Sequence, residues 1–454
     1  MSNTKLFNEF TDVSTQQWKQ KIQFDLKGKD YNESLVWESL EGIKVKPFYN
    51  SEDKFIENAI SKPLKPWQIT QAIYAGNEEI ANKKALKALE KGAESILFTI
   101  PNEEIVFAKL LKDIDLKNTV LYFDFQFLSA SYITKANELL NAADSEFYFN
   151  FDSIHHLTKS GNWYTNSEED FIQFDAIAAT TNAITLDVSH YQNAGANLVQ
   201  QLAYTLAHAN EYLNRIPETK ISDFSVNFKI AVGSNYFFEI AKIRALRLLY
   251  KTVAAAYGAP ENCHILAVTT KRNKTIYDYN SNMLRSTTEC MSAILGSADA
   301  VCNAPYDAIY HKTNDFAERI ARNQLIVLKE ESYFDKTSNP ADGSYYIESL
   351  TKQLAEKALD LFKELEKAGG FLSQLKANTI QKKIKESAQK EQDLFDSKKL
   401  ILVGTNKYQS SLDKMKGDLE LFPFMKNKPR KSSIEPILER RLSEELEQKR
   451  LENE

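Results

Sequence analysis

Short runs of hydrophobic residues alternate, over most of this chain, with segments that repeat apolar side chains at helical spacing. The runs are rich in Val, Ile, Phe and Tyr, and seven of them predict β-strands: 96–100, 120–127, 146–151, 184–190, 224–232, 264–270 and 299–304. Helical periodicity fills intervals between them, at 194–214, 235–257, 283–295 and 314–330. We expect an eighth strand within 171–181 or 325–347.

Strands that alternate with helices indicate βα units and a parallel sheet. With right-handed crossovers, this number of strands favours a closed (βα)8 TIM barrel, an α/β fold. An open, doubly wound sheet is the alternative. No GxGxxG or GxxxxGK[ST] motif follows any predicted strand, which counts against a nucleotide-binding sheet of that kind.

Both ends of the chain differ from this pattern, so we divide it into an arm (1–60), a barrel (61–345) and a C-terminal extension (346–454). The arm is irregular, and its large side chains need a surface on this barrel or on a partner chain. These side chains are Trp18, Phe24, Leu26, Tyr31, Leu35, Trp37, Phe48 and Tyr49. In the extension, Gly369–Gly370 is expected to end a helix, 399–404 to form a strand, and the charged tail 426–454 to form a solvated helix.

Composition restricts the class of protein but says little about the chemistry that the protein could carry out. The 57 basic and 62 acidic residues form no basic stripe, so we expect no nucleic-acid partner. Cys263, Cys290 and Cys302 lie in apolar surroundings without a CxxC pair, which predicts reduced, buried thiols in a cytoplasmic protein. No apolar segment has the length of a signal-peptide core or a membrane span.

Candidate chemistry is sparse. His190 ends the predicted strand 184–190, at the end of a barrel where catalytic residues lie, and could donate or take a proton or donate a hydrogen bond to a substrate carbonyl there. It could equally be a rim histidine bonded to water or backbone. The small residues 194–196 let the next helix begin close to the barrel, and a helix N-terminus favours anions.

His155 and His156 are adjacent and point apart, and no metal-binding or GxSxG spacing occurs. Two arginine pairs at helical spacing are expected to be structural: Arg244 with Arg247, and Arg319 with Arg322.

Longer segments resemble the acyl-CoA mutases, and specifically the methylmalonyl-CoA mutase family. FFEIAKIRALRLLYKTV, NMLRSTTECMSAILGSADAVCNAPYD and DFAERIARNQLIVLKEESYFDKTSNPADGSYYIESLT look like the family's barrel. KPWQITQAI resembles its RPWTIRQY, FTIP its FDLP, SHYQNAGA its YHMQEAGA and LVGTNKY its VGVNKY. The arm segment LKGKDYNESLVWESLEGIKVKPFYN is similar to that of small (beta) subunits. Gln192 and Arg285 lie within matching segments and are candidates for contacting a substrate.

Other positions depart from the family's active chains. Lys62 stands where those chains have a tyrosine facing substrate and cobalamin, and Thr70 stands where they have an arginine. Residues 268–271 read VTTK instead of QTSG, and NEEIVFAKLL replaces a GYDSDH stretch after FTIP. Of these contact positions only the histidine, His190, is kept. The resemblance therefore implies a non-catalytic small subunit in which His190 is vestigial.

The segment RRLSEELEQKRL resembles the close of the family's barrel half, and the family's cobalt-binding DxHxxG motif is absent. The resemblance implies no cobalamin-binding domain and no cofactor or metal bound by this chain. Adenosylcobalamin would lie in a partner large subunit, within a heterodimer that interconverts succinyl-CoA and methylmalonyl-CoA in propionate metabolism. Two alternatives stay open: a catalytic barrel that uses cobalamin carried by a separate B12-binding protein, and a TIM barrel with an unrelated ligand or a structural role.

Overall fold

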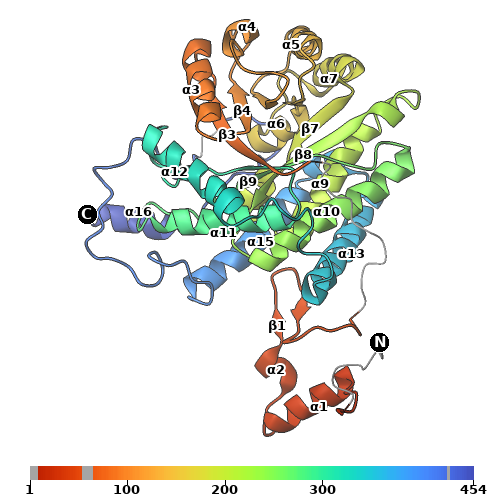
Figure 1. The fold of residues 1–454 in the computed structure, drawn as a ribbon, viewed down its shortest axis with the longest axis vertical. Helices are drawn as coiled ribbons and strands as arrows, with labels where there is room; N and C mark the ends of the chain where they lie inside the picture. Colours follow the sequence, from red (N-terminus) through yellow and green to blue (C-terminus); the bar gives the residue numbers. More distant parts are fainter. Residues whose placement is uncertain (1–8, 54–64, 427–429) are drawn as a thin grey trace, which may run out of the picture.

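Eight parallel strands surround a common axis in the computed structural model, which describes residues 9–53, 65–426 and 430–454 (Figure 1). The strands are β3 (Gln68–Tyr74), β4 (Ser95–Ile100), β5 (Val120–Phe125), β6 (Phe147–Asn150), β7 (Ala183–Asp187), β8 (Ser225–Val232), β9 (Ile265–Thr269) and β10 (Ala300–Cys302). Their hydrogen-bonded order is β6-β5-β4-β3-β10-β9-β8-β7. The first barrel strand therefore pairs with the last, and the barrel is nearly closed, with its seam between β6 and β7. The predicted (βα)8 TIM barrel is confirmed.

The eighth strand is β3, so its predicted position was wrong. Residues 171–181 lie in helix α7 (Ser167–Thr181), and 325–347 cover a helix end, a π-helical turn and a loop. The sequence of β3 contains no run of large apolar residues, because Gln68, Thr70 and Gln71 interrupt it. Its pairing with β4 and β10 on either side, rather than its own hydrophobicity, makes it a strand.

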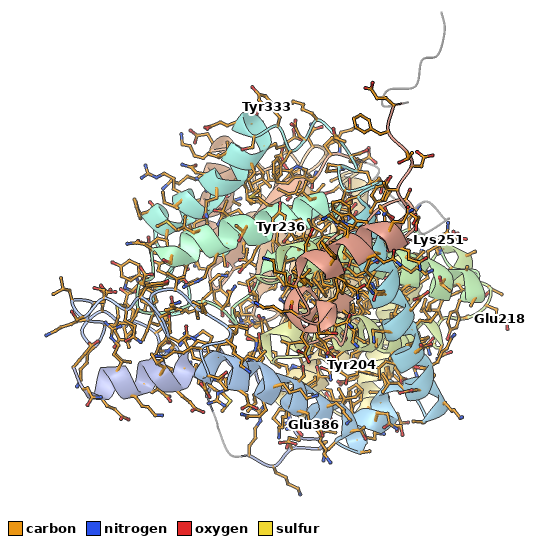
Figure 2. The ribbon with its side chains drawn as sticks, turned by 90° about the horizontal axis from the view of Figure 1, so that it is seen from below. Tyr204, Glu218, Tyr236, Lys251, Tyr333 and Glu386 are labelled. Carbon is orange, nitrogen blue, oxygen red and sulfur yellow. The ribbon has the colours of Figure 1, made fainter. Side chains whose placement is uncertain are left out.

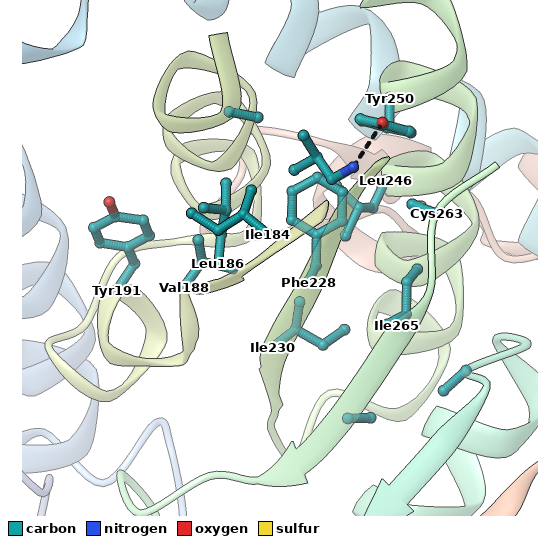
Figure 3. Close-up of a cluster of buried hydrophobic side chains, with 14 of the residues drawn as sticks. Ile184, Leu186, Val188, Tyr191, Phe228, Ile230, Leu246, Tyr250, Cys263 and Ile265 are labelled. Carbon is teal, nitrogen blue, oxygen red and sulfur yellow. Dashed lines mark hydrogen bonds between the residues drawn. The ribbon is translucent and has the colours of Figure 1, made fainter. Parts of the chain in front are cut away.

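The two faces of each strand build two separate cores, as the period of two along a strand requires. Figure 3 shows part of the outer core, in which Leu186, Phe228 and Ile265 are buried beside Leu246 and Tyr250 of α10. The Tyr250 hydroxyl accepts a hydrogen bond from the backbone N–H of Val226 at 3.3 Å. The inner faces form a smaller cluster along the barrel axis: Leu97, Val120, Tyr122, Leu266, Ala300 and Cys302.

Helices cover the outside of the barrel, and most begin at a polar residue whose side chain accepts a backbone N–H. The helices of the barrel are α3 (Glu78–Glu90), α4 (Phe107–Leu110), α5 (Ala130–Ala142), α6 (Ser153–Ser160), α7, α8 (Ser189–Asn193), α9 (Leu198–Leu213), α10 (Tyr236–Tyr257), α11 (Ser281–Leu295) and α12 (Asp315–Ile326). A short 3₁₀ turn, Ile221–Asp223, precedes β8, and a π-helical turn, Val327–Glu331, extends α12. The predicted helices between the strands are confirmed.

The N-terminal arm projects from this body and has two parts. Helices α1 (Thr15–Asp25) and α2 (Tyr31–Leu35) come first, followed by a hairpin of β1 (Trp37–Glu38) and β2 (Lys44–Val45). The hairpin packs on the body: the Trp37 ring meets Phe238 of α10 edge-on at 5.7 Å, and Ile43 is fully buried. In contrast, α1 buries none of its residues, and Figure 2 shows it in front of the body when the molecule is viewed from below.

The C-terminal extension contains α13 (Tyr345–Lys367), α14 (Phe371–Lys376), α15 (Thr379–Asp396) and α16 (Glu444–Glu452). The glycine pair ends α13 as predicted, with Gly369 and Gly370 at φ +102° and +85°. The strand predicted at 399–404 is wrong, since this segment forms only one isolated bridge, between Val403 and Lys407. Its apolar side chains contact α15 and the barrel mouth instead of a sheet.

In the described part of the tail only 444–452 is helical, as α16, which corrects the prediction of one solvated helix over 426–454. Residues 430–443 run in extended form across the loops that follow β6, β7 and β9. The backbone N–H groups of Ile437, Arg440 and Leu442 donate to carbonyls of those loops at 2.7–3.0 Å. Arg441 and Glu447 form a buried ion pair at 2.6 Å, so these charges are inside the molecule.

Cys263, Cys290 and Cys302 are buried and unpaired, as the sequence predicted. None of the helices in the described ranges is both long and apolar enough to cross a membrane.

Candidate functional site

A cavity of about 590 Å³ opens at the carboxyl ends of β7, β8 and β9, where TIM-barrel enzymes hold their active sites. Loops after these strands form its floor, while the arm hairpin and the segment after α15 form its rim. The apolar side chains at the rim are partly exposed: Trp37, Leu40, Leu284, Ile401 and Val403. The polar side chains below them include Gln192, Glu239, Arg272, Asn273 and Arg285.

The floor of the cavity is a closed polar network. Lys242 Nζ lies 2.5 Å from Glu239 and donates to Gln192 and Gln201 at 3.0 and 3.1 Å. The other end of Gln192 donates to Glu239 at 3.0 Å. Burial lowers the pKa of Lys242, against the opposing effect of Glu239. A Cβ at Gly233 would lie 2.3 Å from the amide nitrogen of Gln192, so a side chain there would displace Gln192 from this network. The polar groups therefore bind one another.

The two arginines of the cavity hold the C-terminal extension in place. Arg272 pairs with Glu391 of α15 at 2.5 Å and donates to the carbonyl of Arg440 at 2.6 Å. Arg285 donates to the carbonyl of Val403 at 2.7 Å and to Asn282 at 2.7 Å. Each guanidinium group donates to an oxygen of the extension, which joins the extension to the barrel mouth.

His190 lies inside the molecule and not at the rim of the barrel, contrary to the prediction from its position after 184–190. Strand β7 ends at Asp187, and His190 falls in the short helix α8, where it is fully buried. Its Nε2 is 2.8 Å from the Thr158 hydroxyl and its Nδ1 is 3.1 Å from His155 Nδ1. Burial, reinforced by His155, holds the pKa of His190 well below its ordinary value, so the ring is neutral.

Of the three predicted site residues, Gln192 and Arg285 line the same cavity and His190 does not. The sequence reasoning missed Glu239, Lys242 and Arg272. A signal for the first two was present, because they are oppositely charged residues three apart on the predicted helix 235–257.

Aromatic side chains occupy the amino-terminal part of the barrel axis. The Tyr148 ring stacks on His264 with centroids 3.9 Å apart, and Tyr122 stacks on Tyr148 at 5.3 Å. The Tyr122 hydroxyl is 2.8 Å from His264 Nε2. These three residues come from β5, β6 and the start of β9, and together they close this half of the axis.

An ion cluster crosses the axis nearer the carboxyl ends of the strands. Lys229 of β8 pairs with Asp187 of β7 at 3.0 Å and with Asp124 of β5. Asn150 of β6 donates to Asp124 at 3.0 Å. Lys229 holds the pKa of Asp187 well below its ordinary value, overcoming the effect of burial. The cluster thus ties four strands together across the seam of the barrel.

The positions that depart from the family's active chains have structural partners. The Thr70 hydroxyl lies 2.8 Å from that of Ser95 inside the barrel. In the 268–271 segment, Thr270 and the backbone N–H of Lys271 both donate to Asn193, at 2.8 and 2.9 Å. Lys62 lies outside the described residues.

All six histidines of the chain have partners within the protein. His155, His190 and His264 bond as described above, His208 bonds Asp152 at 2.9 Å, and His311 lies 3.2 Å from Asp307. His156 stacks on Tyr164 at 3.8 Å, and burial lowers its pKa to about 4. Within the described part of the chain, no group of three or more His, Cys, Asp or Glu side chains could hold a metal ion.

Comparison with known proteins places these features in a family. Residues 163–453 match the family model of methylmalonyl-CoA mutase. The chain is 35% identical to the methylmalonyl-CoA mutase small subunit of Porphyromonas gingivalis, with 89% of this chain and 71% of that subunit covered. It is 27% identical to the small subunit of Propionibacterium freudenreichii subsp. shermanii, with 81% and 64% covered.

A large subunit is also similar. The methylmalonyl-CoA mutase large subunit of Porphyromonas gingivalis is 35% identical over half of this chain and a third of its own length, 33%. The chain thus spans about two thirds of the small subunits that it matches and a smaller part of the large one. The family match covers more than half of the sequence and includes strands β7 to β10 and most of the C-terminal extension. This chain belongs to the methylmalonyl-CoA mutase family.

Proposed function

We propose that this chain is the non-catalytic small subunit of a heterodimeric, adenosylcobalamin-dependent methylmalonyl-CoA mutase. Its role is to bind and stabilise a catalytic large subunit, and the complex interconverts succinyl-CoA and methylmalonyl-CoA. The relatives named as small subunits, and the large subunit named from one of the same organisms, support the pairing.

The observation that carries this proposal is the position of His190. It is the one family contact residue that the sequence keeps, yet it has no exposed surface and its two ring nitrogens face Thr158 and His155. A general acid or a hydrogen-bond donor must come within about 3 Å of its substrate. Such contact would require the Thr158 and His155 bonds to break and the loop to open.

The occupation of the barrel interior by protein side chains gives independent support. Radical chemistry needs a water-free cavity with free groups that contact the substrate. Here the lower axis is filled by Tyr122, Tyr148 and His264, and the floor of the upper cavity bonds to itself through Lys242 and Gln192. Few donors remain for a substrate.

We assign adenosylcobalamin to the large subunit. When bound there, the cofactor supplies the homolysis of its cobalt–carbon bond. Support comes from this chain's histidines, each of which is already engaged by a protein group. His311, whose side chain is 24% exposed, lies between Asp307 and Asp418 at 3.2 and 3.4 Å.

The test is reconstitution with the large subunit from the same organism. We expect the isolated chain to bind no adenosylcobalamin in equilibrium dialysis and to show no mutase activity, whereas the complex is active. His190→Asn in this chain should leave kcat of the complex within about twofold. Loss of an acid, base or hydrogen-bond donor from a working site costs roughly a hundredfold or more.

Three results would contradict the proposal. Stoichiometric cobalamin binding by this chain alone would make it a cofactor-binding chain. Co-purification of a short B12-binding protein, in place of a large mutase chain, would favour a catalytic barrel. A hundredfold loss of kcat in the intact His190→Asn complex would show that this barrel works. The matched control is Asn at the corresponding histidine of the large subunit, which should abolish activity.

A further inference from the structure

Five arginines are buried in this molecule, and one differs from the others in its electrostatic environment. Four have a carboxylate oxygen within 2.7 Å: Arg244 with Asp342 and Glu348, Arg247 with Asp299, Arg272 with Glu391 and Arg441 with Glu447. Arg322 is 9% exposed and has no carboxylate within 4.0 Å in the portion of the chain that the structure describes. A buried charge without a carboxylate at ion-pair distance is costly, and the more distant Glu318 only partly offsets the burial that lowers the pKa of Arg322.

The Arg322 guanidinium is held by neutral groups and reaches an open space. Its Nε donates to the carbonyl of Lys91 at 3.0 Å, and its Nη1 makes a long bond of 3.3 Å to Gln71. No hydrogen-bond acceptor among the described residues is recorded for Nη2. The side chain lines a cavity of about 480 Å³ between α3 and α12, on the outer wall of the barrel. In Figure 1 these two helices lie next to each other.

The other charged groups of this cavity are predominantly basic. Its two carboxylates are already paired across the helices, Asp315 with Lys87 at 2.7 Å and Glu318 with Lys84 at 3.6 Å. Lys91, which pairs with Glu90 at 2.7 Å, and Arg319 complete the lining together with Arg322. Arg319 lies over the Phe316 ring at 5.5 Å, a contact that fixes it without neutralising it. Five cations and two anions therefore surround the space.

We propose that this cavity binds an anion that carries phosphate groups. A guanidinium presents a planar fork of donors that matches two phosphate oxygens. Arg319, like Arg322, has no carboxylate within 4.0 Å among the described residues, and the charge of the two guanidinium groups together would be balanced by a diphosphate and not by a single carboxylate. The volume also exceeds that of one phosphate group. Inorganic pyrophosphate and the diphosphate of a nucleotide or coenzyme share this chemistry.

The site is separate from the barrel mouth, so it does not depend on the proposed mutase role. It lies outside the strands, next to Gln71, whose side chain stands between the buried Ile69 and Ile73 on the same strand. A polar residue at that place makes sense if it positions Arg322 towards the cavity.

The test is calorimetric titration of the full-length chain with pyrophosphate at constant ionic strength, with chloride as the balancing anion. We expect saturable binding with one site per chain. Lys91→Gln combined with Arg319→Gln should weaken binding at least tenfold without loss of fold, because both side chains are on the surface. Lys83→Gln is the control for a general charge effect: it removes one positive charge from α3 at an exposed position outside the cavity and should leave binding unchanged.

Further titrations distinguish the ligand classes. ADP that binds as tightly as pyrophosphate would identify the diphosphate as the recognised group, and tighter binding of ADP would show that the nucleoside contributes. Equal affinity for succinate would refute the phosphate assignment. The site itself would be refuted if pyrophosphate failed to saturate, or if Lys83→Gln weakened binding as much as the double variant. Arg322→Lys keeps the positive charge but loses the planar fork of donors. Its affinity for pyrophosphate should lie between those of the Lys83→Gln control and the double variant.

Discussion

Removing α1 separates the two surfaces that the N-terminal arm can serve. A chain that begins at Asp30 keeps the N-cap of α2 and the hairpin that packs on the barrel, including the buried Tyr31 and Ile43. It loses α1, whose residues are all partly or fully exposed and whose ring contact with the rest of the arm is Trp18 against Phe48 at 5.8 Å. We expect the free truncated chain to unfold at nearly the wild-type temperature and to bind the large subunit poorly.

The size of the effect follows from exposed aromatic surface. Trp18 is 50% exposed and Phe24 is 78% exposed in the free chain. Aromatic residues bury about 150–250 Å² each, so at ~25 cal/mol per Å² covering the remaining surface of each is worth roughly 2–4 kcal/mol. Truncating one interface anchor typically costs ~2 kcal/mol, or about thirtyfold in Kd. The double variant Trp18→Ala, Phe24→Ala should weaken the complex by roughly a thousandfold if both are anchors.

The assay is surface binding kinetics with immobilised large subunit, combined with thermal unfolding of each free chain. Tyr333→Ala is the matched control, because Tyr333 is 64% exposed but lies on the body away from the arm (Figure 2). It should leave Kd within about twofold, as expected for an aromatic residue outside the interface.

Two results would refute this reasoning. A truncated chain with full affinity would show that α1 does not contact the large subunit. A free truncated chain that unfolds at a clearly lower temperature would show that α1 stabilises its own barrel, although the structure gives it no buried residue.

Three further predictions concern stability. Lys229→Met leaves two nearly buried aspartates uncompensated and should lower the free energy of unfolding by about 3–5 kcal/mol in urea titrations, whereas Lys21→Met in an exposed pair should change it by less than ~0.5 kcal/mol. Burial lowers the pKa of His190, so the unfolded state binds more protons as pH falls below about 6.5. Stability should then decrease by up to about 1.4 kcal/mol per pH unit for each such histidine, and His190→Asn should flatten the dependence between pH 7 and 5.5. Gly233→Ala should shift the urea midpoint downward by forcing Gln192 from its network; an unchanged midpoint would contradict that packing.

The barrel could be predicted from the sequence where strands have large apolar residues on both faces. The 120–127 run is such a case, because Leu121, Phe123 and Phe125 face the helices while Val120 and Tyr122 fill the axis. Strand β3 lacked this signal. Its neighbours in space are β4 and β10, and β10 lies more than two hundred residues later in the sequence, so no local pattern could identify it.

The position of His190 could not be predicted for a related reason. The sequence places it after an apolar run, which is compatible with a residue that points towards the barrel mouth or into the core. Which of these two orientations the side chain adopts depends on Thr158 and His155 of α6, which contact its ring nitrogens. Gln192, two residues later, points into the cavity instead. Two residues only two positions apart on one short helix therefore differ completely in their surroundings: His190 is enclosed in the core, and Gln192 lines the cavity.

The charged tail shows most clearly why charge patterns mislead about burial. Arg441 and Glu447 belong to a run of alternating charges that is typical of a solvent-exposed helix. In the structure Arg441 bonds the carbonyls of Lys274 and Pro423, and Glu447 accepts the backbone N–H of Ile276. A buried ion pair needs such additional hydrogen bonds to offset its desolvation. Because these partners lie up to 171 residues away in the sequence, the charged run alone contains no sign of them. The segment whose charges suggest an exposed terminus is therefore the one that packs across the loops of the barrel mouth.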